Sequence, residues 1–157
     1  MKPQLTFEEW QAMEPSEVAR LVHVKAAGLR PGQRKAVFAM LACEEEIAGR
    51  LARGTGKSEL AGLPFVVKDV FDAADWPTRA GATFLDQVRP VPKADGALVA
   101  RMRTEGAVLA GKTHLHEFAY GITGENPHYG DVEHPALPGR TSGGSSSGSA
   151  AAVAAGV

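Results

Sequence analysis

The chain has 157 residues with a formal net charge of −1, and 44% of them are hydrophobic and 22% charged, the composition of an ordinary globular protein with one modest core. The balanced charge leaves no electrostatic footprint for nucleic acid or an anionic membrane, and no apolar run is long enough to span a bilayer. Cys43 is the only cysteine, and the first residues lack a secretory apolar core. We therefore expect a cytoplasmic protein without nucleic-acid or membrane partners.

Helix signals dominate residues 1–53, which we expect to form an N-terminal helical layer over a core. Thr6 and Glu9 have the spacing of a capping box, which predicts a short first helix. A second helix, capped by Ser16, is expected to follow. The apolar stripe of residues 33–52 predicts a single third helix.

Residues 53–58 contain the run Gly-Thr-Gly-Lys-Ser, which invites comparison with a phosphate-binding loop. The Walker pattern requires a glycine where Leu51 stands, and a predicted helix precedes the run instead of a strand. We interpret this segment as a polar linker.

Residues 63–70 are a short apolar run rich in β-branched residues, which predicts a strand buried on both faces, and the apolar run of residues 107–111 predicts a second buried strand. A helix over residues 96–105, with Asp95 as its N-cap, connects them. This strand–helix–strand order predicts parallel pairing of the two strands in an α/β fold. The inward face of the connecting helix is expected to comprise Leu98, Val99 and Met102.

Another helix is expected from Thr113 to Tyr120. His114 and His116 lie in it at an alternate spacing, which puts them on different faces. No third ligand lies at a suitable spacing, so we predict no metal site.

Lys68 is unusual because a cation in an apolar strand is costly unless it is paired or neutralised. Burial lowers a lysine pKa and turns the ammonium into a usable base. The alternative is a lysine on an edge strand whose head reaches solvent, and the residue alone does not decide between the two.

Residues 138–156 pass from a tight Gly/Ser turn into a helix of alanines. A flexible linker is the alternative, but linkers seldom run directly into a strong helix former. The stretch also satisfies the G-x-S-x-G pattern of an α/β-hydrolase, with Ser146 as nucleophile. That pattern needs a preceding strand, and residues 137–142 make a poor one.

Three segments in this order, residues 61–69, 111–127 and 143–156, resemble the amidase signature family, whose members hydrolyse amides with a Ser–cis-Ser–Lys triad. The resemblance covers residues 45–157. It implies an amidase-signature α/β fold, with a central mixed sheet flanked by helices and an N-terminal helical layer. Residues 54–157 are then the first part of the core, and the nucleophile is expected past Val157.

The resemblance also implies roles for individual residues. Lys68 corresponds to the base, and Ser145 corresponds to the serine that follows a cis peptide and relays the proton. A cis bond before a non-proline residue costs roughly 3–4 kcal/mol and persists only where its surroundings fix it. The supporting residues are Gly143, Gly144 and Ser146, and the residues expected to line the substrate cleft are Tyr120 and Thr123.

The function implied by the resemblance is hydrolysis of the C–N bond of a small-molecule amide. The reaction is expected to need no cofactor or metal. A homodimer is left open as the oligomeric state. The alternative is a non-catalytic or assembly component of an amidotransferase-like complex. Because the nucleophile is expected elsewhere, we predict that the 157 residues alone are inactive and poorly folded.

Overall fold

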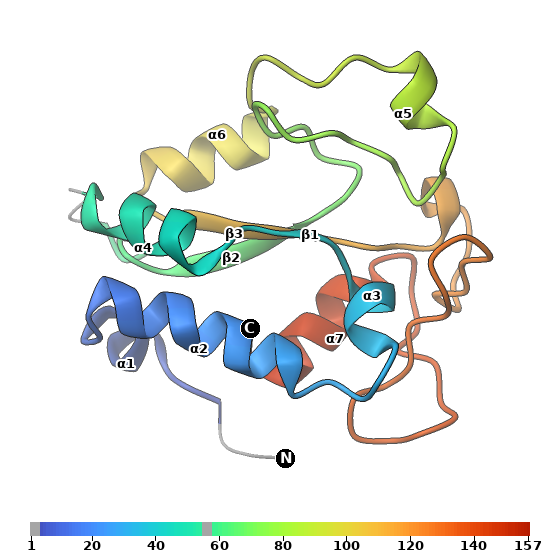
Figure 1. The fold of residues 1–157 in the computed structure, drawn as a ribbon, viewed down its shortest axis with the longest axis horizontal. Coiled ribbons are helices and arrows are strands. Elements are labelled where there is room, and N and C mark those ends of the chain that lie inside the picture. The colour runs from blue at the N-terminus through green and yellow to red at the C-terminus, as the bar shows by residue number, and fades with distance from the viewer. Residues whose placement is uncertain (1–3, 55–57) are drawn as a thin grey trace.

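The computed structural model describes residues 4–54 and 58–157, so the predicted linker lies partly outside the described residues. Helices and strands alternate along the chain (Figure 1). The helices are α1 (Phe7–Gln11), α2 (Pro15–Ala27), α3 (Gln33–Val37), α4 (Glu44–Ala52), α5 (Leu85–Val88), α6 (Ala97–Thr104), the 3-10 helix η1 (Glu117–Ala119) and α7 (Ser147–Ala155). The strands are β1 (Phe38–Leu41), β2 (Pro64–Lys68) and β3 (Val108–Thr113).

The strands form one mixed sheet in the order β1-β3-β2. β3 is antiparallel to β1 and parallel to β2, so the parallel pairing predicted from the strand–helix–strand order is confirmed. Every residue of β3 is buried, as expected for a central strand. β2 lies at the edge of this sheet and is only partly buried, so the prediction of burial on both faces was wrong for it.

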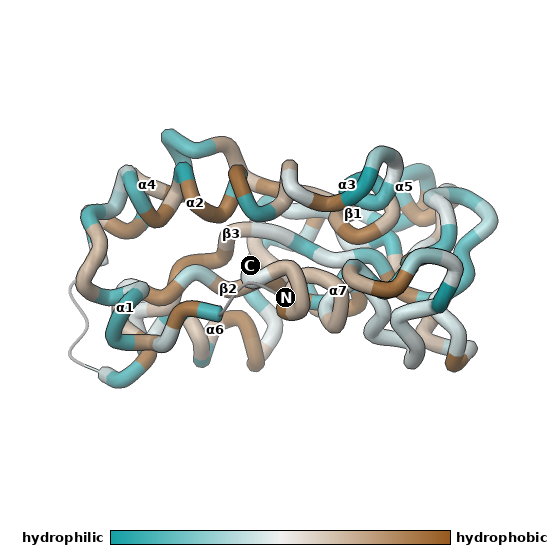
Figure 2. The backbone as a smooth tube through the Cα atoms, turned by 90° about the horizontal axis from the view of Figure 1, so that it is seen from below, coloured by the Kyte–Doolittle hydropathy of each residue, from teal (hydrophilic) through white to brown (hydrophobic). Residues whose placement is uncertain are grey.

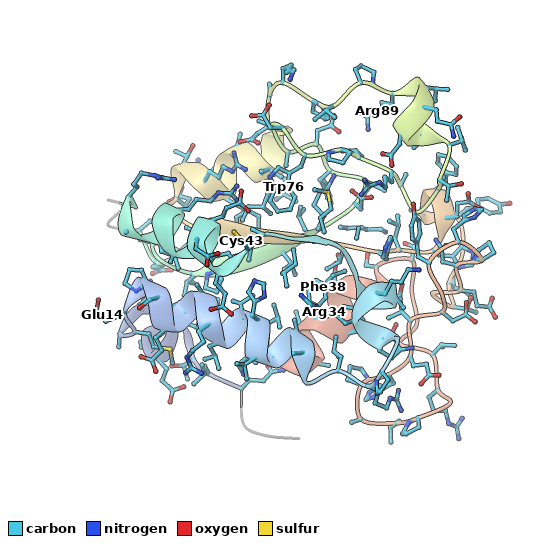
Figure 3. All side chains as sticks on the ribbon, viewed as in Figure 1. Glu14, Arg34, Phe38, Cys43, Trp76 and Arg89 are labelled. Carbon is cyan, nitrogen blue, oxygen red and sulfur yellow. The ribbon has the colours of Figure 1, made fainter. Side chains whose placement is uncertain are left out.

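Helices cover both faces of the sheet. Figure 1 shows α6 on one side of the strands and α1, α2 and α7 on the other. Trp76, labelled in Figure 3, lies on the α6 side, where the Arg50 guanidinium is 5.6 Å from its ring centroid. Hydrophobic and hydrophilic segments alternate along α2 and α4 (Figure 2), as in helices that turn one face to a core. The α/β class predicted from the sequence is therefore confirmed.

The predicted third helix was wrong, because residues 33–52 form two helices with β1 between them. β1 pairs with β3, and Gly111 allows the close approach, since a Cβ there would lie 2.7 Å from the Met40 carbonyl oxygen. Sheet pairing thus overrides a helical apolar pattern. The helix restarts at Cys43, whose backbone amide donates to Glu46 Oε2 at 3.2 Å. The domain division at residue 53 stays a prediction.

The helix ends were predicted with mixed success. The Thr6–Glu9 capping box is confirmed. Ser16 is not a cap, because Pro15 takes the first position of α2, where its fixed φ and missing N–H cost little. Asp95 does not cap α6 either, since its carboxylate accepts the Ala74 amide at 2.8 Å.

Two further predictions about helices were wrong. Leu98 is 45% exposed and does not face inward, although Val99 of the same helix is fully buried. The helix expected from Thr113 is replaced by the end of β3 and the short η1, because Thr113 continues the parallel ladder with Lys68. Among residues 4–54 and 58–157, no helix combines the length and apolar character needed to cross a membrane.

Candidate active site

Two residues 77 positions apart meet at the carboxyl end of β2. Lys68, the last residue of that strand, donates from Nζ to Ser145 Oγ at 2.7 Å. Ser145 lies in the turn that leads into α7. The structure therefore brings together the two residues singled out from the sequence.

Lys68 is half-buried, and its pKa is lowered from the ordinary lysine value because burial removes water from the ammonium. The partner at Nζ is a neutral hydroxyl, which does not hold the lysine in its charged form as a carboxylate would. A lowered pKa increases the fraction of neutral amine at a given pH, and the neutral amine is the form that a general base requires.

The turn before Ser145 depends on two glycines. Gly143 and Gly144 have φ values of 74° and 65°, a region that residues with a Cβ rarely adopt. The Gly144 amide donates to the Ile122 carbonyl oxygen at 2.7 Å, and the Ser145 carbonyl oxygen accepts the His116 amide at 3.1 Å. The backbone on both sides of the Gly144–Ser145 bond is therefore fixed by the segment after β3.

The expectation of a cis peptide before Ser145 was wrong, because the described residues contain no cis peptide bond. The left-handed glycines already turn the chain enough for the Ser145 hydroxyl to reach Lys68.

The first turn of α7 packs directly against the sheet. A Cβ on Gly148 would lie 2.6 Å from the Val37 carbonyl oxygen and would also collide with the His114 backbone. The hydroxyls of Ser149 and Thr113 lie 2.7 Å apart, which joins α7 to the end of β3. Close backbone contact and this hydrogen bond place Ser145 above the end of β2.

Ser146 is exposed and occupies the N-cap position of α7, but its side chain makes no capping hydrogen bond. No strand precedes it, since the only ladder contact in residues 137–142 is an isolated bridge at Thr141. The strand–turn–helix context of an α/β-hydrolase nucleophile is thus missing around Ser146.

The loop with Tyr120 and Thr123 lies against the turn, since Ile122 between them accepts the Gly144 amide. Tyr120 is 94% exposed. Thr123 donates to Glu125 Oε2 at 2.8 Å. Their assignment to a substrate cleft stays a prediction.

Sequence reasoning missed a second buried lysine beside the first. Lys112 of β3 is fully buried, and its Nζ lies 2.6 Å from Oδ1 of Asp69, the residue after Lys68. The pKa of Asp69 is raised and that of Lys112 lowered, in both cases mainly by burial. The signal was present in the sequence: Lys112 interrupts an apolar strand just as Lys68 does.

His114 is also buried, with its ring stacked on Tyr129 at 4.1 Å between centroids. Burial, together with the nearby positive charges of Arg79 and Lys35, lowers its pKa to about 4. His116 is separated from it by the buried Leu115. In the part of the chain that the structure describes, no three His, Cys, Asp or Glu side chains gather as a metal site would need.

Comparison with known proteins places the chain in a family. The Amidase family model matches residues 21–157, so the chain belongs to this family. Over 107 residues it is 49% identical to AtzE of Pseudomonas sp. (strain ADP), a 1-carboxybiuret hydrolase subunit, in an alignment that covers 68% of this chain and 23% of the relative.

A second relative and a solved structure match nearly the whole chain. One of the subunits of the glutamyl-tRNA(Gln) amidotransferase of Anaeromyxobacter sp. (strain K) is 40% identical over 150 residues, 93% of this chain and 30% of the relative. The structure of Kluyveromyces lactis allophanate hydrolase superimposes with a TM-score of 0.75 at 28% identity, covering 95% of this chain and 25% of the other. The chain thus spans a third or less of each of these proteins.

Proposed function

We propose that the whole protein carrying these residues hydrolyses the C–N bond of a small carboxamide, with Lys68 as base and Ser145 as proton relay. One observation carries the proposal, the 2.7 Å hydrogen bond between Lys68 Nζ and Ser145 Oγ at a partly desolvated lysine. Family membership and the amide-cleaving names of two matched proteins, the 1-carboxybiuret and allophanate hydrolases, support the reaction class.

The proposed proton path runs through this hydrogen bond. A neutral Lys68 amine accepts the Ser145 proton as Ser145 Oγ takes the proton of an attacking serine hydroxyl. The attack gives a tetrahedral intermediate, and its collapse breaks the C–N bond. The same path, run backwards, returns the proton from Lys68 to the leaving nitrogen. This leaves the acyl group as an ester on the attacking serine. A water molecule, deprotonated along the same path, then attacks the ester, and the proton returns to the serine as the carboxylic acid leaves.

The loop that carries Tyr120 and Thr123 is proposed to border the substrate, because Ile122 holds the turn on which Ser145 lies. The exposed ring of Tyr120 is then available to a bound amide, and Thr123 would contact the amide only by exchanging its hydrogen bond to Glu125 Oε2. The identity of the amide is left to experiment.

A second candidate is an assembly role, because two of the matched relatives are named as subunits. The two candidates differ in one measurable respect. A catalytic protein releases ammonia or an amine by itself, whereas an assembly component needs its partner.

The test is an assay of the purified whole protein on a panel of small carboxamides, with ammonia release as the readout and with and without a metal chelator. Turnover that survives chelation supports the proposal. Turnover lost on chelation and restored by added metal would overturn the metal-free mechanism, and turnover only with a partner protein would favour the assembly role.

A further inference from the structure

The buried pair Asp69 and Lys112, called the anchor pair below, lies on the opposite side of the sheet from Ser145. Asp69 directly follows Lys68, so their side chains point to opposite faces. Both members of the anchor pair are fully buried. A buried ion pair usually stabilises a core no better than apolar side chains of similar volume, because desolvation offsets most of its Coulomb energy. Its presence one residue from Lys68 therefore calls for a role.

The anchor pair fixes the loop of residues 77–81. Lys112 Nζ donates to the Pro77 carbonyl oxygen at 2.8 Å and to Thr78 Oγ1 at 2.9 Å, in addition to its contact with Asp69. Asp69 Oδ2 accepts the Arg79 amide at 3.1 Å, and the Asp69 carbonyl oxygen accepts the Ala80 amide at 2.9 Å. Lys112 Nζ, Asp69 Oδ2 and the Asp69 carbonyl oxygen thus hold this loop on the ends of β2 and β3, whereas Asp69 Oδ1 faces only Lys112.

The loop in turn holds the segment that follows β3. The Ala80 carbonyl oxygen accepts the Phe118 amide at 2.8 Å. The Gly81 carbonyl oxygen accepts Nδ2 of the buried Asn126 at 2.9 Å. Ala80 reaches its partner with a φ of 50°, a conformation that a residue with a Cβ keeps only when the surroundings impose it, and Gly81 has a φ of 77°, which glycine adopts freely.

The segment after β3 closes the circuit at Ser145. His116 donates its amide to the Ser145 carbonyl oxygen, and Ile122 accepts the Gly144 amide. A continuous set of hydrogen bonds therefore runs from Asp69, through residues 77–81 and 116–126, to the backbone of Ser145. It begins one residue from Lys68 and ends at the partner of Lys68.

We infer that Asp69 and Lys112 are positioning residues that set the contact between Lys68 and Ser145 by fixing both ends of it through this circuit. The inference rests on the proposed function, since it assigns the purpose of the circuit to that proton relay. Neither residue touches the relay itself. A misplacement of about 1 Å in such a contact reduces turnover by on the order of 100-fold.

The experiment uses three variants of the whole protein, Asp69→Asn, Lys112→Met and the double variant. Each single variant leaves a buried group without its partner and is expected to lower the melting temperature, whereas the double variant removes both charges and is expected to recover much of it. The expected kcat is lower by on the order of 100-fold in all three, with KM within about twofold of wild type.

Asp95→Asn is the matched control. Asp95 also accepts a backbone amide from the segment between β2 and α6, that of Ala74, and also pairs with a cation, Arg103 Nη1 at 3.0 Å. It lies outside the circuit to Ser145, so this variant is expected to lose stability and keep kcat. Recovery of kcat together with melting temperature in the double variant would mean a structural role only and would overturn the inference.

Amide hydrogen exchange provides a readout that does not need activity. The amides of His116 and Gly144 are expected to exchange at least about tenfold faster in the double variant than in wild type, and to be unchanged in Asp95→Asn. Equal protection in the double variant and wild type overturns the inference. If the wild-type protein cleaves no amide, the proposed function fails on that result alone, and hydrogen exchange still decides whether the anchor pair holds the turn.

Discussion

Lys68 Nζ and Ser145 Oγ are 2.7 Å apart although 77 positions separate the residues in the chain. β2 supplies the lysine, and a glycine turn at the start of α7 supplies the serine. The contact combines a desolvated amine with a hydroxyl whose backbone is held from both sides. It is the basis of the proposed proton relay.

Removing the relay hydroxyl tests its role directly. Ser145→Ala in the whole protein is expected to reduce kcat by on the order of 100-fold, less than loss of the lysine, because a water molecule can occupy the space of the hydroxyl. Ser16→Ala, which removes an exposed hydroxyl in α2, serves as control. Steady-state kinetics of both variants check this, and equal kcat values for them would contradict the relay.

Ser146→Ala separates the proposal from the α/β-hydrolase alternative. Ser146 is exposed, and no strand leads into it. Its removal is therefore expected to leave turnover within a few-fold of wild type. Loss of all turnover, together with loss of covalent labelling by a serine-directed fluorophosphonate, would make Ser146 the nucleophile.

Gly148 is expected to tolerate no side chain, because its Cβ would lie 2.6 Å from the Val37 carbonyl oxygen. Gly148→Ala should lower the free energy of unfolding by about 1–3 kcal/mol, the usual cost of overpacking. Gly49→Ala is a matched control in α4, where the Cβ would have only the end of Arg53 at 3.9 Å. That variant should gain up to about 1 kcal/mol from helix propensity. Denaturant unfolding of both variants checks the pair, and equal effects would contradict the packing at α7.

His114 predicts a pH dependence of stability. Burial lowers its folded-state pKa to about 4, so the unfolded state binds the proton first as pH falls. The stability that neutral His114 contributes is fully present above an unfolded pKa of about 6.5 and is lost between there and about pH 4, a change on the order of 3 kcal/mol.

His114→Phe keeps a ring against Tyr129 and removes the titration, so its unfolding free energy should vary less with pH over this range than that of the wild type. Parallel curves for wild type and His114→Phe would contradict this prediction.

The elements predicted most accurately from the sequence were those in which local pattern and tertiary environment agree. The runs around β2 and β3 are apolar and β-branched, and both form strands. The prediction of a single helix over residues 33–52 failed because β1, in the middle of this segment, pairs with β3. That pairing is a long-range contact, which the local apolar pattern does not contain. Helix caps failed where a nearby backbone amide competed for the same carboxylate, as at Asp95.

In the candidate site too, features that depend on local sequence were predictable and features that depend on tertiary contacts were not. A lysine in an apolar strand is unusual, so Lys68 could be singled out from the sequence, but its role as base and the role of Ser145 came from the family resemblance. The partnership of Lys112 with Asp69 was not recognisable, because it depends on the register between β2 and β3. The lowered pKa of His114 was not predictable either, because it depends on the side chains that bury the ring.

The central claim is that Lys68 acts as the base, and the most direct measurement is the rate of ammonia release by the whole protein and its Lys68→Ala variant. The variant is expected to lose roughly 1,000-fold to 10,000-fold of kcat, the upper part of the contribution of a general base. Lys93→Ala, which removes a lysine whose side chain is 86% exposed, should retain the wild-type rate. A Lys68→Ala enzyme that folds and turns over as fast as Lys93→Ala would contradict the account.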